Sequence, residues 1–175
     1  MILVYILIAV ILLVIYLLKI NFDLLNYKDK SLRALAALDA AIIKKNIVIL
    51  DILGYARENM PKEDRLICEL FNIRHDISKI RTKIVNAQER FEKQKEFDSK
   101  VEILLGAATK YSDLKKNIGF QQCLENFYNL ESEFNTRVED YNLIVNKFYS
   151  LVHTFPGSII AKLTKTMEPP ATYEK

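Results

Sequence analysis

The sequence holds few side chains of the kinds that carry out catalysis or bind metals. Its two histidines, His75 and His153, have no companion at the HxxxH or ExxH spacing of metal ligands. The two cysteines, Cys68 and Cys123, stand in separate segments without a CxxC pair, which argues against a zinc site and a disulfide framework. We therefore predict no catalytic, cofactor-binding or metal-binding residue, and a protein that is not an enzyme.

Four acidic residues gather in the C-terminal half, but helix geometry spreads them around the helix instead of onto one face. They are Glu131, Glu133, Glu139 and Asp140. The four glycines are isolated, so the sequence has no glycine-rich phosphate-binding loop, and it has no serine in a Gly-x-Ser-x-Gly context. An enzyme with an unrecognised site is accordingly the least favoured function.

The charge is nearly balanced, which argues against nucleic-acid binding. The chain has 25 basic and 22 acidic residues, for a formal net charge of +3. Residues 61–102 alone hold ten basic and nine acidic residues, so they offer no concentrated basic face to a phosphate backbone. We expect neither nucleic acid nor a metal among the partners.

The N-terminal segment has the composition of a membrane span. Residues 2–18 contain no charged side chain, and 14 of these 17 are Ile, Leu or Val. Those fourteen alone favour the bilayer by roughly 4–8 kcal/mol. Seventeen helical residues rise about 26 Å, close to the thickness of the hydrocarbon core. We predict a transmembrane anchor over residues 1–20 that contacts the lipid bilayer through residues 2–18.

A cleaved signal peptide is the competing interpretation of this segment. It would need a basic n-region and a small-residue cleavage site. Only the α-amino group precedes the apolar run, and Lys19-Ile20-Asn21-Phe22 has no A-x-A-like pattern, so an uncleaved anchor is favoured. Basic side chains follow the span and none precedes it: Lys19, Lys28, Lys30 and Arg33. By the positive-inside rule, this predicts a single-pass protein of the cell membrane with its C-terminal domain in the cytoplasm.

The rest of the chain is predicted to be helical, because glycines and prolines, at four each, are too few for an all-β fold. Beyond Pro61, apolar residues recur at alternating spacings of four and three, as in a coiled coil. They are Leu66, Leu70, Ile73, Ile77, Ile80, Ile84, Ala87 and Phe91. This series predicts one helix that starts at Pro61 and runs through Phe91 with one buried face.

A second apolar series predicts a long helix that stops at Phe155, before Pro156. Its members are Phe120, Leu124, Phe127, Phe134, Val138, Tyr141, Val145, Phe148, Val152 and Phe155. Glu131 occupies one position of this series. A glutamate there can lie at the edge of the apolar face, fix the register of the helices or contact a ligand, and the first is the commonest case.

Two further helices complete the predicted bundle. Residues 21–59 contain no proline, so the first helix is free to continue out of the span, and a shorter helix is expected at 98–110 before a polar turn at 110–117. Whether residues 94–100 form a turn or continuous helix stays open. We predict an all-α protein, with a transmembrane helix continuing into an antiparallel bundle of three to four long helices.

The predicted domains are the anchor at 1–20, the bundle at 21–165 and a flexible C-terminal tail at 166–175. The short apolar segment at 158–163 is expected to fold back on the end of the bundle. Because some twenty apolar positions are available, at roughly 1.5–3 kcal/mol for each fully buried side chain, the bundle needs no cofactor in order to fold.

Several motifs follow a recognisable order along the chain. The clearest are Leu104-Leu105, Tyr111-Ser112-Asp113-Leu114-Lys115-Lys116-Asn117 and Phe120, preceded by Leu38-Asp39, Lys44-Lys45 and Gly54-Tyr55-Ala56, and followed by Glu131, Asn135, Arg137, Tyr141-Asn142, Phe155-Pro156, Ile160-Ala161 and Tyr173-Glu174. From about residue 27 to residue 174, this order resembles the LemA family of bacterial membrane proteins. Ser112 replaces the usual proline, Leu35 replaces a tryptophan, and the stretch before Gly54 is shorter by about one helical turn. The resemblance implies an anchored helical bundle and no known reaction.

These observations favour a membrane-tethered interaction module that presents its bundle to an unidentified protein partner or acts as a membrane-associated scaffold. The alternatives are self-association through the span and the first helix, with a membrane-organising role, and membrane shaping by the basic residues after the span. A scaffold should display an exposed apolar or single-sign patch, whereas an enzyme should gather polar side chains in a concave pocket.

Overall fold

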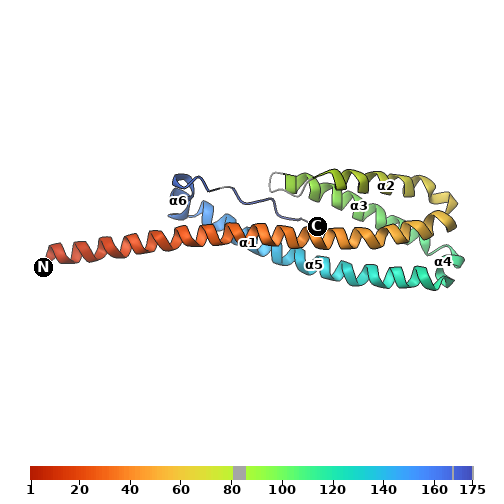
Figure 1. Ribbon diagram of the computed structural model, residues 1–175, viewed down its shortest axis with the longest axis horizontal. Coiled ribbons are helices and arrows are strands. Elements are labelled where there is room, and N and C mark those ends of the chain that lie inside the picture. The colour runs from red at the N-terminus through yellow and green to blue at the C-terminus, as the bar shows by residue number, and fades with distance from the viewer. Residues whose placement is uncertain (81–85, 167, 175) are drawn as a thin grey trace.

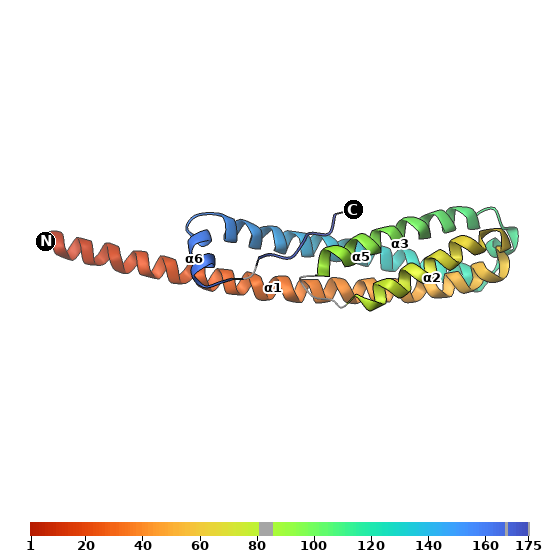
Figure 2. The same ribbon diagram turned by 90° about the horizontal axis from the view of Figure 1, so that it is seen from above.

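The computed structural model describes residues 1–80, 86–166 and 168–174, and the regular elements in these ranges are helices. In chain order they are α1 (Ile2–Asn59), a 3-10 turn η1 (Pro61–Glu63), α2 (Asp64–Lys79), α3 (Ala87–Ala108), α4 (Ser112–Lys116), α5 (Ile118–His153) and α6 (Gly157–Leu163). In Figures 1 and 2, α1 and α5 run antiparallel and the α2–α3 hairpin covers them, while the N-terminal part of α1 projects alone. The predicted all-α fold is confirmed.

α1 is one uninterrupted helix of 58 residues that passes from an exposed segment into the bundle. Every side chain in residues 2–16 is exposed, whereas apolar side chains from Leu24 onward are buried at helical spacing. Among the described residues, α1 is the one helix whose length and composition suit a membrane crossing. The prediction that the first helix continues directly out of the apolar segment is confirmed.

Apolar clusters follow one another along the axis of the bundle, and α1 and α5 contribute to each of them. The cluster farthest from the apolar segment includes Phe127, and the middle one surrounds Tyr141. The cluster nearest the apolar segment joins Leu24 of α1, Phe148 of α5 and Ala161 of α6. Segment 158–163 therefore folds back on the end of the bundle, as predicted.

The prediction of one helix from Pro61 through Phe91 is wrong, because the chain reverses direction after α2. α2 ends at Lys79 and α3 begins at Ala87, so the two helices form an antiparallel hairpin (Figure 1). The apolar series is divided between them: Leu70, Ile73 and Ile77 are buried on α2, and Ala87 and Phe91 are buried on α3. Ile84 falls outside the described residues.

Arg90 supplies the physical reason for the end of α2. Its guanidinium donates hydrogen bonds to the carbonyl oxygens of Ile77 and Ile80, at 3.1 and 2.8 Å. The last carbonyls of a helix have no partner within the helix, and a basic side chain satisfies them. The sequence gives no glycine or proline at this point, so the apolar spacing crosses the break without marking it.

From α3 to the start of α5, the structure agrees more closely with the elements predicted from the sequence. Residues 94–100 are continuous helix inside α3, which begins well before the helix expected at 98–110. The predicted polar turn at 110–117 contains the short helix α4, whose Leu114 is fully buried. Asn117 then caps α5, because its side-chain oxygen accepts a hydrogen bond from the backbone N–H of Phe120 at 3.0 Å.

The apolar series of α5 is buried at the predicted spacing at seven of its members. They are Phe120, Phe127, Phe134, Val138, Tyr141, Val145 and Phe148. Phe155 departs from the prediction, since α5 ends at His153 and the Phe155 side chain is 76% exposed.

The C-terminal residues 168–174 pack along the bundle, which differs from the predicted flexible tail at 166–175. Tyr173 is only 3% exposed, and its ring centroid lies 4.9 Å from that of Phe91 and 5.4 Å from that of Phe134. Asn142 on α5 holds the backbone of Tyr173 by accepting from its N–H at 2.8 Å and donating to its carbonyl at 2.7 Å. The tail is thus a packed element of the middle cluster.

Candidate functional site

A charged layer crosses the core where α1, α3 and α5 meet. The side chain of Lys45 on α1 is fully buried, and its Nζ lies 2.8 Å from Oδ1 of Asp98 on α3 and 3.0 Å from Oε2 of Glu131 on α5. The same Nζ lies 4.2 Å from the centroid of the Phe134 ring, which is a favourable position for a cation. One ammonium thereby links the three helices.

Amide side chains extend this layer on α3. Gln94 is fully buried and donates to Oδ1 of Asp98 at 2.8 Å, and it exchanges hydrogen bonds with the buried Asn46 of α1 at 3.0 and 3.2 Å. Burial raises the pKa of the Asp98 carboxyl above its ordinary value, while the ammonium of Lys45 partly opposes this rise. Lys45 is thus held by ion-pair contacts, and Gln94 and Asn46 are held by side-chain hydrogen bonds.

A second ion pair lies nearby, at the turn between α2 and α3. The guanidinium of Arg90 is 6% exposed and contacts the carboxylate of Asp39 on α1 while it also caps α2. Arg90 therefore fixes the position of the hairpin relative to α1. A buried pair of this kind stabilises only in the intact network, because loss of one partner leaves a charge without compensation.

A shallow pocket of about 310 Å³ opens beside the charged layer. Its polar lining is formed by Asp98, Glu102, Thr109, Tyr128 and Glu131. Two of the three carboxylates, those of Asp98 and Glu131, lie in ion-pair contact with Nζ of Lys45. These contacts join α1, α3 and α5, which fits a role in fixing the register of the three helices.

The residues considered for chemistry from the sequence do not meet in this layer, apart from Glu131. His75 and Cys68 are exposed on α2, and His153 stacks on Tyr149 at the end of α5 with ring centroids 4.2 Å apart. Cys123 is half-buried, and both cysteines are free. Within the described residues, no group of three or more His, Cys, Asp or Glu side chains is arranged to hold a metal ion.

The acidic group of α5 is divided, as helix geometry predicts. Glu131 pairs with the buried Lys45, Glu133 lies 3.6 Å from the exposed Lys44, and the remaining two are exposed. Of the three roles left open for Glu131, its pairing with Lys45 fits the fixing of helix register. The side chain is 34% exposed, so it also lies at the edge of the apolar face.

Sequence reasoning missed Lys45, although a signal was present. Lys45 stands in the buried series of α1 between Ile42 and Ile49, as Glu131 stands in the series of α5 and Gln94 in the series of α3. Polar residues interrupt the buried face of each helix: Ser31, Lys45 and Asn46 on α1, Arg90 and Gln94 on α3, and the half-buried Glu131 on α5. A comparison of these positions would have indicated Lys45 as a candidate partner of Glu131.

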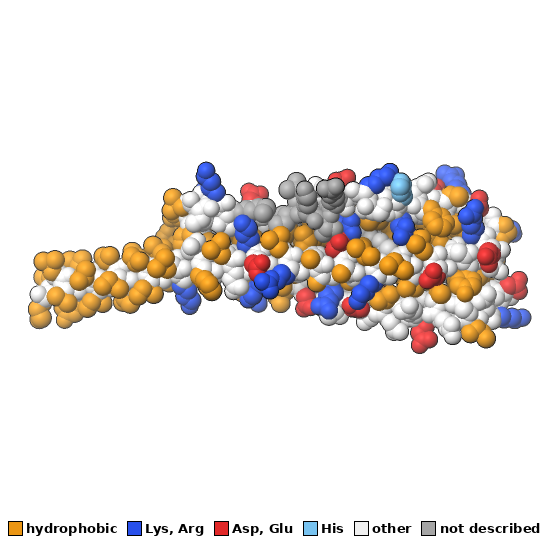
Figure 3. Space-filling view, viewed as in Figure 1, with side chains coloured by type: hydrophobic (Ala, Val, Ile, Leu, Met, Phe, Trp, Pro, Cys, Tyr) orange, Lys and Arg blue, Asp and Glu red, His pale blue; other side chains and the backbone are white. Residues whose placement is uncertain are grey.

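A different feature is a line of exposed apolar side chains on α1, of which Ile43 and Ile47 border a pocket against the α2–α3 hairpin. Leu25, Leu32, Ile43 and Ile47 are 51%, 40%, 48% and 52% exposed. At about 100° per residue, these positions lie within roughly 60° of one another around the helix, so they form one line along it. We call these four side chains the outer stripe, and Figure 3 shows hydrophobic side chains along this side of α1.

The fold and these features define a class of protein, a helical bundle carried on a helix apolar enough to cross a membrane. The chain belongs to the LemA family, whose family model matches residues 34–174. The charged layer and the packed tail lie within the matched region, and the apolar segment precedes it. No curated protein and no solved structure gives a significant match to the chain.

Proposed function

We propose that this chain is a single-pass membrane protein without catalytic activity, and that its bundle presents the outer stripe of α1 to a protein partner. The observation that carries the proposal is the exposure of four large apolar side chains on one side of α1, from Leu25 to Ile47. The stripe extends over about 33 Å of helix, which is long enough for a partner helix to pack along it. Covering these apolar side chains with a partner surface would remove them from water, which lowers the free energy of the complex.

The charged layer supports a binding role over a catalytic one. A general acid or base needs a group that can change its protonation in contact with a substrate. Lys45 has no contact with solvent, and both carboxylates that face it are engaged by its ammonium. The layer is therefore best suited to fixing the register of the helices, which holds α1 and its outer stripe in a defined orientation relative to the rest of the bundle.

The continuity of α1 supports a defined orientation of the stripe relative to the membrane. The apolar segment and the stripe belong to one unbroken helix, so tilt and rotation of the span are passed directly to the bundle. We further propose that the bundle lies on the cytoplasmic side, because the basic residues Lys19, Lys28, Lys30 and Arg33 follow the span.

Self-association is the second candidate function, and the same continuity favours it. Leu18 and Phe22, both exposed, continue the line of the stripe into the apolar segment. A membrane would place two copies parallel and in equal register, so that the stripes of both could pack together. The partner in that case is a second copy of the chain.

In-cell photocrosslinking tests the proposal with the full chain in its own membrane. A photoreactive phenylalanine analogue is placed at Leu32 or Ile43, and the matched control is Ile103 on α3, which is 59% exposed but lies off the stripe. We expect protein adducts from the two stripe positions and none from the control. An adduct with the mass of two copies would assign the surface to self-association. Equal yields at all three positions, or none at the stripe, would refute the proposal.

A further inference from the structure

The end of the bundle nearest the apolar segment carries a second exposed apolar surface. Phe155, Ile159 and Leu163 are 76%, 50% and 78% exposed. They are spaced by four residues across the elbow after α5 and along α6, so Ile159 and Leu163 share one side of that helix. We call these three side chains the α6 face.

The position of α6 along α1 is fixed by close packing. Ala161 is buried against Leu24 and Phe148, and Ile20 and Ile160 pack against the same cluster. A Cβ atom at Gly157 would lie 3.8 Å from Cγ2 of Ile20 and 2.1 Å from the carbonyl oxygen of Leu151. Glycine at this position therefore allows the start of α6 to approach the backbone of α5, while the van der Waals contact with Ile20 places it beside that residue of α1.

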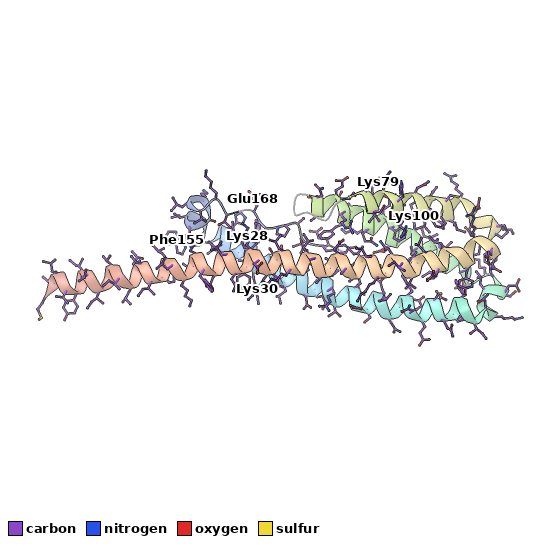
Figure 4. The ribbon with its side chains drawn as sticks, viewed as in Figure 1. Lys28, Lys30, Lys79, Lys100, Phe155 and Glu168 are labelled. Atoms are coloured by element: carbon purple, nitrogen blue, oxygen red, sulfur yellow. The ribbon has the colours of Figure 1, made fainter. Side chains whose placement is uncertain are left out.

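The level of Ile20 coincides with the end of the apolar segment. Residues 2–18 rise about 26 Å as a helix, and Ile20 lies only about 3 Å beyond them. A helix held there would lie at the boundary between the hydrocarbon and the headgroups, which begins within a few ångströms of the end of the span. Figure 4 shows Phe155 at the edge of the bundle nearest the apolar segment, with Lys28 and Lys30 farther along α1.

The charges around α6 complement an anionic lipid surface. Lys162 and Lys165 are exposed on or just after α6, and Lys19 is exposed at the end of the apolar segment. Basic residues beside an apolar face are typical of helices that lie in the membrane interface. In Figure 3, hydrophobic surface continues from the apolar segment onto the upper side of the neighbouring end of the bundle, and basic side chains lie beside it.

We propose that the α6 face inserts into the leaflet from which α1 emerges, as a second contact with the same bilayer. The contact would fix the tilt of the bundle on the membrane, because a single helix alone leaves it free to rock. The inference shares the membrane span of α1 with the proposed function, but it does not depend on the outer stripe or on any protein partner.

Spin-label depth measurements test this inference with the full chain in vesicles of phosphatidylcholine and phosphatidylglycerol. Single labels are attached at Phe155→Cys, Ile159→Cys or Leu163→Cys, with Cys68→Ser and Cys123→Ser removing the native thiols. Ile118→Cys at the far end of the bundle is the matched control, because Ile118 is also apolar and 76% exposed. A label at Ile8→Cys reports the depth of the span itself.

We expect the ratio of oxygen to nickel-chelate accessibility to be several-fold higher at the three α6-face positions than at position 118, and to fall at these positions when phosphatidylglycerol is left out. A label at Ile8 deep in the bilayer, with the α6 face as accessible to nickel as position 118, would overturn the inference and leave the proposed function standing. Low accessibility to both reagents at the α6 face would indicate contact between copies and would also overturn it. A water-accessible label at Ile8 would overturn both proposals.

Discussion

The Nζ atom of Lys45 lies 3.0 Å from Oε2 of Glu131, and this contact joins α1 to α5, the two longest helices of the bundle. The ammonium is fully buried while the carboxylate remains one-third exposed. Asp98, at 2.8 Å, adds α3 to the same contact. The register of three helices therefore depends on one lysine side chain.

Replacing Lys45 with methionine should lower the free energy of unfolding by about 3 kcal/mol, because the carboxylates of Asp98 and Glu131 lose their counter-charge. Thermal and denaturant unfolding of the full chain in detergent, followed by circular dichroism, measures the change. Arg33→Met is the matched control, since the Arg33–Asp29 pair is exposed and should contribute no more than about 1 kcal/mol.

The triple variant K45M/D98N/E131Q should recover part of the stability lost in K45M, because it removes the unpaired charges together with the lysine. A Lys45→Met chain as stable as the parent would show that the layer does not hold the helices. A triple variant less stable than K45M would show that the carboxylates stabilise the fold through other contacts.

The charged layer also predicts a pH dependence. Burial raises the pKa of Asp98 in the folded chain above its ordinary value of 3.8, so between these two values the folded state binds more protons than the unfolded state. The contribution of Asp98 to stability therefore falls as the pH rises from 3.8 through the raised pKa, and it is constant above it.

Unfolding of the parent and of Asp98→Asn in denaturant, over a series of pH values, measures this contribution as the difference between the two free energies. We expect the stability of the parent relative to the variant to decline as the pH rises through the window. Glu102→Gln, which removes an exposed carboxylate from the same helix, is the matched control for the substitution itself. A parent that gains stability relative to Asp98→Asn with rising pH would contradict the raised pKa.

The packed tail predicts that Tyr173 matters for stability although it lies close to the C-terminus. Tyr173→Ala should lower the free energy of unfolding by about 3 kcal/mol, because a buried ring leaves a cavity between Phe91 and Phe134. The neighbouring Glu174 is exposed, so Glu174→Ala should change the free energy of unfolding by at most about 0.5 kcal/mol. Thermal unfolding followed by circular dichroism compares the two variants. Equal melting temperatures for the two variants would argue that the tail is not packed in solution.

The proposed membrane orientation can be checked with a native side chain. Cys68 is exposed on α2, so a membrane-impermeant maleimide should label it only after the cell membrane has been permeabilised, if the bundle is cytoplasmic. Cys68→Ser accounts for any reaction at the half-buried Cys123. Labelling of Cys68 in intact spheroplasts would place the bundle on the outer side.

The sequence predicts best what is encoded within one helix. The apolar segment and the series of α5 from Phe120 to Phe148 follow from local spacing, and both are found in the structure. The turn after α2 could not be predicted, because Arg90 caps it from the following helix, and a cap of that kind leaves no glycine or proline in the sequence.

Long-range contacts explain the other differences. The burial of Tyr173 depends on Asn142, 31 residues earlier in the chain, and on the rings of Phe91 on α3 and Phe134 on α5. The partners of Lys45 come from α3 and α5, so the spacing within α1 says only that a polar residue interrupts the buried face. The residues of the outer stripe can be read from the sequence as a second apolar line on α1. They can be identified as an exposed surface only when the other apolar line of α1 is known to be buried.

The proposal that the outer stripe binds a partner is tested by the size of the complex that the chain forms in its native membrane. The measurement is native electrophoresis of membranes that contain the parent chain, the stripe variant L32K/I43K or the off-stripe control I103K. Lysine at exposed helical positions leaves the fold intact, so circular dichroism and the melting temperature should match among the three chains. If the outer stripe binds a partner, we expect a complex larger than the single chain for the parent and for I103K, and its loss in L32K/I43K. A complex of unchanged size in L32K/I43K, or only single chains in all three samples, would contradict the proposal.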